Sequence, residues 1–139
     1  MAIKQLNPYL NFEGDAAKAA KFYEQALDAK IETLTKYGDT PDAKPEMKDR
    51  VIHALLKLGE TGVIMMSDAP PGAPFVKGTN NYVCLDFDDA ADMAKKFDAL
   101  AAGGSVGMAL QDTFWGARFG FLTDAFGVNW MFNCQLKKD

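Results

Sequence analysis

The sequence has few of the residues from which catalytic and metal-binding motifs are usually built. Its 139 residues include a single histidine, His53, and two cysteines, Cys84 and Cys134. One imidazole without a matched carboxylate cannot build a metal site. Both cysteines lie in apolar, strand-like runs, which are typical of buried reduced thiols rather than of a disulfide framework. CxxC pairs, HExxH, glycine-rich phosphate loops and nucleophile elbows are absent, which excludes the activities that depend on those motifs.

A surplus of basic residues and a long hydrophobic run are also missing. Lysine and arginine number 15 against 19 aspartate and glutamate residues, which gives a formal net charge of −4. Nonspecific nucleic-acid binding requires a basic surface, so no nucleic-acid partner is expected. No apolar run reaches the roughly 20 residues that span a bilayer. The first residues, MAIKQLNPYLNFEG, lack the basic end and apolar stretch of a signal peptide. We therefore expect a cytoplasmic protein without a membrane partner.

The sequence does contain one structural unit that occurs twice. The alternating apolar residues of 6–12 predict a strand, and Asp15 is expected to cap a helix over 15–28. Three more strands are predicted in the first half, at residues 30–37, 50–58 and 62–66.

The same order returns after a linker over residues 67–80, which holds three prolines. The predicted elements are a strand over 81–87, a helix over 89–102 that begins at Asp88-Asp89, and strands over 105–111, 118–123 and 128–134. The halves align at an offset of 75 near their beginnings and of 65 near their ends, where Met66 meets Met131. This repeat predicts an α+β fold of two tandem βαβββ modules, about 1–66 and 81–136, within a single domain of residues 1–139.

Three segments resemble the vicinal oxygen chelate (glyoxalase/bleomycin resistance) superfamily, and its PhnB-like branch in particular. They are PYLNFEGDAAKAAKFYEQAL at 8–27, HALLKLGETGVIMMSDAPP at 53–71 and DTFWGARFGFLTDAFGVNWMFN at 112–133. The resemblance implies that the two modules form a curved mixed sheet around a cleft, usually in a homodimer. It implies no particular reaction, because the superfamily hosts isomerases, dioxygenases, transferases and simple binders on one fold. A methyltransferase is disfavoured, because the sequence has no strand-loop-helix glycine signature for an adenosyl group.

The alternation within each strand is expected to place one face against the helices and the other in the cleft. Leu6, Ile52, Phe119 and Phe121 are predicted on the helix side. The cleft side is then polar and mostly uncharged, which suits hydrogen bonding to a small molecule, although a merely solvated face would look the same. The loop residue Trp115 is expected to form a lid or a stacking wall, or else to fill a dimer interface or the core. With Trp115, the predicted ligand-binding residues are Asn7, Tyr9, Asn11, His53, Tyr82, Asp86, Arg118, Asn129, Met131 and Asn133.

The resemblance also implies where a metal would bind. Metal-dependent relatives place one ligand on the first strand of each module and one on the last, usually His or Gln and then Glu. The first-strand positions hold Asn7 and Tyr82, and the last-strand positions hold Met66 (or Met65 under a shift of one residue) and Met131. None of these is a normal ligand for a divalent metal, so neither a metal nor another cofactor is expected.

Two classes of function fit these observations. The first is a small-molecule binding protein, or an enzyme that works without a metal in a lyase or isomerase type of reaction. His53 and Tyr9 are the candidate acid and base, because an imidazole titrates near neutral pH, while a ligand-binding or structural role for His53 stays open. The second class is a structural or regulatory dimer with a vestigial cleft. The sequence identifies neither the ligand nor whether the protein is catalytic.

Overall fold

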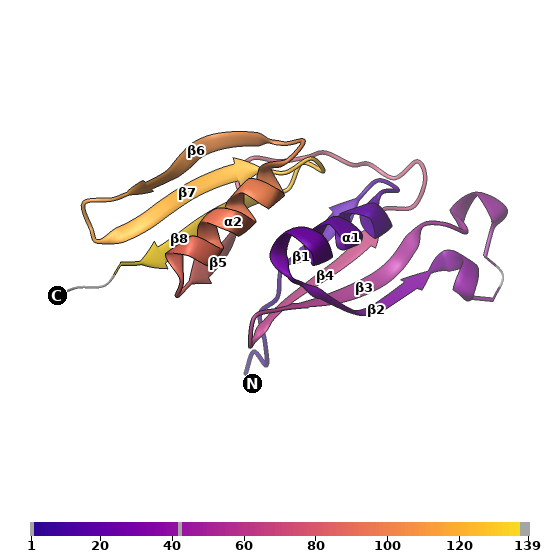
Figure 1. Ribbon diagram of the computed structural model, residues 1–139. Helices are drawn as coiled ribbons and strands as arrows, with labels where there is room; N and C mark the ends of the chain where they lie inside the picture. The colour runs from indigo at the N-terminus through magenta and orange to yellow at the C-terminus, as the bar shows by residue number, and fades with distance from the viewer. Residues whose placement is uncertain (1, 42, 137–139) are drawn as a thin grey trace. The chain divides into compact units, whose positions relative to one another are not determined.

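The computed structural model describes residues 2–41 and 43–136, which divide into two compact units. The first unit ends at Val76 and the second begins at Lys77. Each has the order strand, helix and three strands, and each contains one four-stranded mixed sheet (Figure 1). The predicted pair of βαβββ modules is therefore confirmed.

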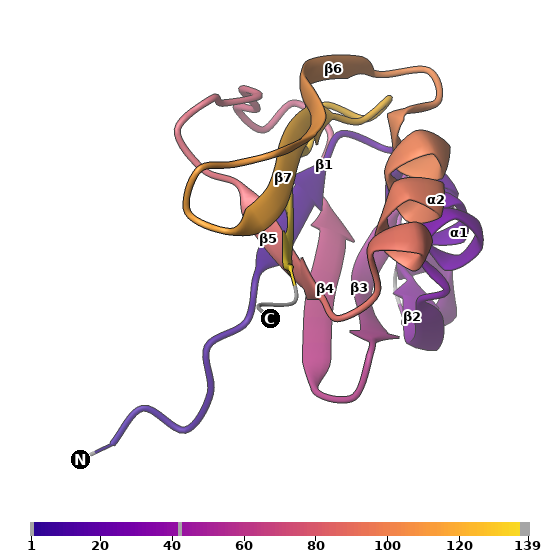
Figure 2. The same cartoon turned by 60° about the vertical axis from the view of Figure 1, so that its left-hand side comes forward.

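The first unit is built on a sheet with the strand order β1-β4-β3-β2. β1 is parallel to β4, and the other neighbouring strands are antiparallel. Helix α1 lies against one face of this sheet in both views (Figure 1, Figure 2). The elements are β1 (Tyr9–Phe12), α1 (Ala16–Leu27), β2 (Lys30–Lys36), the short helices η1 (Tyr37–Asp39) and η2 (Pro45–Met47), β3 (Val51–Leu58) and β4 (Gly62–Asp68).

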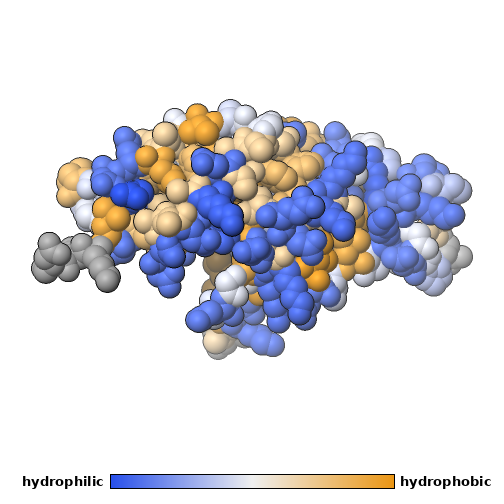
Figure 3. Space-filling model, in the orientation of Figure 1, coloured by the Kyte–Doolittle hydropathy of each residue, from blue (hydrophilic) through white to orange (hydrophobic). Residues whose placement is uncertain are grey.

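Small residues let α1 approach its sheet closely. Ala16, Ala19 and Ala20 are at most 1% exposed, and Tyr23 is fully buried beside them. The segment with η1 and η2 carries few apolar residues, and Figure 3 shows its surface as mainly hydrophilic. This segment therefore forms a polar extension of the unit rather than part of its core.

The second unit repeats the arrangement with the strand order β5-β8-β7-β6. β5 is parallel to β8, and the remaining pairs are antiparallel. Neither α-helix in the described part of the chain has the length and apolar character that crossing a bilayer requires. The elements are β5 (Val83–Phe87), α2 (Ala90–Ala101), β6 (Ser105–Asp112), β7 (Ala117–Thr123) and β8 (Asn129–Gln135).

An aromatic cluster packs the core of the second unit between its sheet and α2. The Phe132 ring stacks on Phe87 at a centroid distance of 5.5 Å and meets Phe97 of α2 edge-on at 5.0 Å. Trp130 is fully buried, and its Nε1 donates to the carboxylate of Asp124 at 2.9 Å. The same carboxylate accepts the backbone N–H groups of Phe126 and Val128, so it stabilises the turn before β8.

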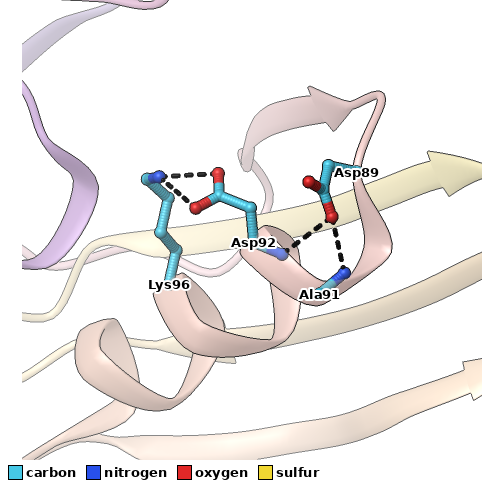
Figure 4. A network of polar contacts seen from close by, with 4 residues as sticks. All are labelled: Asp89, Ala91, Asp92 and Lys96. Carbon is cyan, nitrogen blue, oxygen red and sulfur yellow. Dashed lines mark hydrogen bonds and ion pairs between the residues drawn. The ribbon is translucent and has the colours of Figure 1, made fainter.

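The two helices begin in different ways. Asp89 caps α2 as predicted, because its carboxylate accepts the N–H groups of Ala91 at 2.9 Å and Asp92 at 3.1 Å (Figure 4). Lys96, one helical turn after Asp92, donates a hydrogen bond from Nζ to the Asp92 carboxylate at 2.6 Å (Figure 4). Asp15 occupies the predicted N-cap position of α1, but its side chain makes no capping hydrogen bond.

The buried residue Asp68, at the end of β4, supplies the missing cap of α1. It is 3% exposed, and its Oδ1 accepts the N–H groups of Gly14 at 2.8 Å and Ala16 at 3.0 Å. Its Oδ2 accepts the N–H of Val51 at 2.8 Å. One carboxylate therefore joins the start of α1 to β3 and β4. Because β4 continues to this residue, the first two positions of the predicted linker belong to a strand.

Two residues predicted on the helix side are exposed instead. Leu6 is 86% exposed, because β1 pairs with β4 only from Tyr9 onward and the preceding segment projects away from the sheet (Figure 2). Ile52 is 37% exposed, whereas Val51 is fully buried. The register between β2 and β3 shifts between Thr35 and Lys36, which leaves Ile52 as a bulge and reverses the alternation of β3 at its start.

Strand register also corrects the alignment of the two modules. Met65 lies opposite Tyr9, and Met131 lies opposite Cys84, which is the equivalent of Tyr9 at the offset of 75. The last strands therefore correspond at an offset of 66, rather than the predicted 65. Met66 is fully buried on the helix side, so Met65 is the structural equivalent of Met131.

Candidate functional site

Each sheet has a second face, which points away from its own helix and is called here the helix-free face. In the first sheet, Tyr9 lies opposite Met65, and Met65 lies opposite Leu55. Side chains directly opposite one another share a face of a sheet. By this register, the helix-free face of the first sheet carries Tyr9, Asn11, Thr35, His53, Leu55, Met65 and Ser67.

Two predicted residues meet on this first face although 44 positions separate them in the chain. The hydroxyl of Tyr9 lies 3.3 Å from Nδ1 of His53, and their ring centroids are 6.0 Å apart. Tyr9 is 46% exposed and His53 is partly exposed, so a small molecule has access to both. Beside them, Ser67 Oγ donates to Asn11 Oδ1 at 3.1 Å. The structure thus brings together a phenol, an imidazole, an amide and a hydroxyl.

The direction of the Tyr9–His53 hydrogen bond depends on the histidine tautomer. When Nδ1 carries the proton, it donates to the phenol oxygen. Nε2 is then free to accept a proton, and the phenol O–H is free to donate one. In this tautomer the pair presents a base and an acid side by side while both groups are neutral.

The helix-free face of the second sheet is more apolar. Cys84 lies opposite Met131, which lies opposite Phe121, and Asp86 lies opposite Asn133, which lies opposite Phe119. Asn133 Nδ2 donates to the Asp86 carboxylate at 3.0 Å. By the same register, this face carries Cys84, Asp86, Phe119, Phe121, Met131 and Asn133.

A continuous row of aromatic rings follows this second face. Tyr82 meets Phe121 edge-on at 5.8 Å, and Phe121 lies 6.5 Å from Phe119. Phe119 lies 6.5 Å from Trp115, whose other neighbour, Phe114, is 5.0 Å away. Trp115 and Phe114 sit in the turn between β6 and β7, where they are 54% and 98% exposed. Trp115 therefore belongs to a larger aromatic row.

The placement of Phe119 and Phe121 on the helix side was wrong. If Phe119 and Phe121 faced the helix, alternation would place Leu122 in the cleft. Leu122 is instead 1% exposed and lies opposite the core residue Trp130, so the alternation of β7 is the reverse of the prediction. Phenylalanine and leucine occupy both faces of this strand, so alternation alone does not show which face is buried. The repeat at its true offset of 66 places Phe119 on the helix-free face, because it aligns Phe119 with His53.

The reversed alternation also removes Arg118 from the predicted ligand-binding set. Arg118 lies opposite the buried Cys134, on the helix side of the sheet, and its Nε donates to Asp112 at 2.7 Å. This hydrogen bond holds the pKa of the Asp112 carboxyl below, and that of the Arg118 guanidinium above, their ordinary values. The pair closes the end of the β6–β7 hairpin.

Three other predicted residues lie at the margins of the faces. Asn129 donates to the carbonyls of Gly78 and Asn81 and accepts from Thr123, so it fastens the segment that leads into β5. Asn7 precedes β1 and accepts a hydrogen bond from Gln5 at 2.7 Å. Tyr82 precedes β5 and is 39% exposed at the edge of the aromatic row.

The positions that the resemblance assigns to metal ligands are Asn7, Tyr82, Met131 and, by the register above, Met65 rather than Met66. Two thioethers, an amide and a phenol are a poor donor set for hard or borderline divalent ions. No group of three or more His, Cys, Asp or Glu residues that could hold a metal occurs within residues 2–41 and 43–136. The donor chemistry at these positions therefore does not fit a divalent metal.

The prediction that both cysteines are buried is confirmed for Cys134 but is wrong for Cys84, which is exposed on the edge strand β5 of the second sheet. Partial desolvation of its sulfur and the nearby Asp86 carboxylate raise the pKa of the Cys84 thiol. Both effects disfavour the thiolate, so this cysteine contributes a neutral, polarisable group rather than a nucleophile.

Comparison with known proteins agrees with this geometry. The family model of the Glyoxalase/Bleomycin resistance protein/Dioxygenase superfamily matches residues 5–132. Protein YjdN of Escherichia coli K12 is 30% identical over 139 residues, covering 92% of this chain and 93% of that protein.

Solved structures show the same fold. The crystal structure of protein PA1353 from Pseudomonas aeruginosa superposes with a TM-score of 0.88 at 39% identity, covering 97% of this chain and 100% of that one. A PhnB protein from Bacillus cereus gives a TM-score of 0.75 at 24% identity, covering 94% and 99% of the two chains. Together with the paired βαβββ modules, these matches show that the chain belongs to the Glyoxalase/Bleomycin resistance protein/Dioxygenase superfamily.

Proposed function

We propose that the protein is a cytoplasmic homodimer that binds a small organic molecule on the helix-free faces of its sheets without a metal. The observation that carries this proposal is the aromatic row Tyr82, Phe121, Phe119 and Trp115 on the second face. A sheet face that only contacts water usually alternates to polar residues. Rings beside a few hydrogen-bonding groups, here Asp86 and Asn133, are instead the usual lining of a ligand site.

Chemical-shift mapping with a library of small aromatic compounds tests this proposal. Amide signals of the ¹⁵N-labelled protein should move on β5, β7 and β8, near the helix-free face, and stay unchanged on the outer surface of α2. Replacing Phe119 with leucine keeps an apolar side chain and removes a ring, so it should weaken these shifts. If no compound binds, or the shifts fall on the helices, the alternative of a structural or regulatory dimer is favoured.

A second candidate function, metal-independent acid–base catalysis, is favoured by one specific observation. The Tyr9 hydroxyl and His53 Nδ1 lie 3.3 Å apart on the first helix-free face. In the tautomer with the proton on Nδ1, Nε2 would take a proton from a bound molecule while the phenol donates one to it. This exchange needs no oxidant, reductant or metal, and it is of the lyase or isomerase type.

Proton exchange with solvent tests this second function without knowledge of the product. Compounds that bind are incubated with the protein in D₂O, and the loss of their C–H signals is followed by NMR. Tyr9→Phe and His53→Gln should each slow this exchange by about 100-fold, since general acid–base catalysis contributes at least that factor. Lys18→Gln, on the exposed side of α1, is the matched control. Exchange that persists in both variants would refute a catalytic role for the pair.

A further inference from the structure

Two sulfur-containing side chains are neighbours on the second helix-free face. Cys84 of β5 and Met131 of β8 are partners in the parallel strand register, and both lie on this face. Cys84 is exposed and Met131 is half-buried, so an ion in solution has access to both. The face therefore presents a thiol and a thioether side by side.

The first module has no such pair at the equivalent positions. There Tyr9 lies opposite Met65, so the partner of the thioether is a phenol. Residues 1–76 contain no cysteine, and the second cysteine of the chain, Cys134, is buried. The pair of sulfur groups is thus a property of the second module, and the first module provides an internal comparison.

The spacing of the pair fits one ion held in line between two sulfur atoms. Neighbouring strands lie about 4.8 Å apart, and two metal–sulfur bonds of about 2.3 Å in line span nearly the same distance. Thiolate and thioether donors select soft ions such as copper(I), which two sulfur ligands suffice to hold. Zinc and similar divalent ions require more ligands, and the described part of the chain contains no group of three His, Cys, Asp or Glu residues that could supply them.

The surroundings of the pair favour an ion of low charge. Phe121 lies opposite Met131, and its ring meets that of Tyr82 at 5.8 Å. These rings border the pair with apolar surface, which disfavours the more strongly hydrated copper(II). Asp86, two residues after Cys84 on the same face, opposes a free thiolate by charge repulsion. A bound copper(I) ion cancels the thiolate charge, so this repulsion does not oppose the complex.

We propose that Cys84 and Met131 bind one copper(I) ion as thiolate and thioether ligands. On binding, the S–H bond of Cys84 breaks, the sulfur donates its electron pair to copper, and the proton passes to solvent. No oxidant or reductant takes part. The site goes beyond the proposed small-molecule binding and does not depend on it. The last-strand position of the second module, which does not suit a divalent ion, thus serves a softer one.

Anaerobic titration with copper(I), supplied as its acetonitrile complex, tests this site. The expected result is a thiolate-to-copper absorption band in the ultraviolet that saturates at one ion per chain. Zinc(II) should bind much more weakly under the same conditions. Absence of the band, or saturation at one ion for two chains, would overturn the proposal, because the second result would show thiolates of two copies sharing an ion.

Variants then separate the pair from an ordinary surface thiol. Met131→Leu keeps an apolar side chain of similar size and removes the thioether, so it should weaken copper(I) binding at least about tenfold, as measured by competition with the chelator ferrozine. Met65→Leu makes the same change in the first module and should leave the affinity unchanged. Cys84→Ser should abolish the band. An affinity that Met131→Leu does not alter would refute the role of the thioether.

Methionine-methyl NMR of the unmodified protein tests the same point without a variant. With ¹³C-labelled methionine methyl groups, the signal of Met131 should shift on addition of copper(I), while that of Met65 should stay in place. A Met131 signal that does not move while the absorption band forms would assign the ion to the thiol alone and overturn the two-sulfur site.

Discussion

Replacing Asp68 with alanine should be among the most destabilising single changes in the first unit. The buried carboxylate accepts three backbone N–H groups, from Gly14, Ala16 and Val51, at 2.8 to 3.0 Å. Each hydrogen bond to a charged group contributes roughly 1.5–3 kcal/mol, and alanine would leave the donors unsatisfied. Because neighbouring bonds are not additive, we expect a loss of about 3–5 kcal/mol in the free energy of unfolding.

Two companion variants of this carboxylate make the prediction specific. Asp68→Asn keeps an acceptor for some of the donors but turns an amide N–H₂ toward one of them, so a loss of about 2–4 kcal/mol is expected. Asp15→Ala removes the residue that local sequence favours as the cap, and it should cost less than about 0.5 kcal/mol because its side chain makes no capping bond. Asp89→Ala, which removes the true cap of α2, should cost about 1 kcal/mol.

Urea denaturation followed by far-UV circular dichroism measures these losses. The slope of the free energy of unfolding against urea concentration, the m-value, should stay unchanged if the native state is intact. Amide hydrogen exchange at Ala16 and Val51 gives a local readout, because both N–H groups lose their acceptor in Asp68→Ala. Equal losses for Asp15→Ala and Asp68→Ala, or unchanged exchange at these two amides, would refute the role assigned to Asp68.

Three further predictions concern the helix-free faces and the assembly. Alkylation of Cys84 should be slow at mildly alkaline pH, because partial desolvation and the Asp86 carboxylate raise the pKa of this thiol. Asp86→Asn should lower the pKa of Cys84 and speed the reaction. An unchanged pH–rate profile in this variant would contradict the electrostatic effect of Asp86. Elemental analysis of the untagged protein should find no stoichiometric divalent metal, since Met65 and Met131 hold the last-strand positions. Near one equivalent of metal that is lost in His53→Ala would instead reveal a site centred on His53. Sedimentation at micromolar concentration should give the mass of two chains, because open sheets leave edges that a second copy covers; the mass of one chain would count against a homodimer.

The features that the sequence determined by itself are those with a local physical cause. The order strand, helix and three strands follows from hydrophobic period, capping and turn residues, and its repetition identifies the fold. The sequence predicts Asp89 as a cap because the N–H groups that its carboxylate accepts lie only two and three residues away. The sequence also predicts the two faces of β5, because Val83, Leu85 and Phe87 alternate with more polar residues without a bulge.

The composition of the candidate site depended on contacts between residues far apart in the chain. Asp68 caps a helix that begins 52 residues earlier, and Tyr9 meets His53 across 44 residues, so no local pattern reports either contact. Alternation predicts the wrong strand face where a bulge interrupts it, as at Ile52, or where apolar residues occupy both faces, as around Phe121.

The tertiary structure alone decided which side chains share a face, because a shift of one residue in strand register turns every side chain to the opposite side. Register separates Met65, on the helix-free face, from its buried neighbour Met66. The same register gathers Phe119, Met131 and Asp86 into one surface. This register is set by hydrogen bonds between the backbones of distant strands. Because every residue type makes the same backbone hydrogen bonds, the sequence of a strand does not report its register.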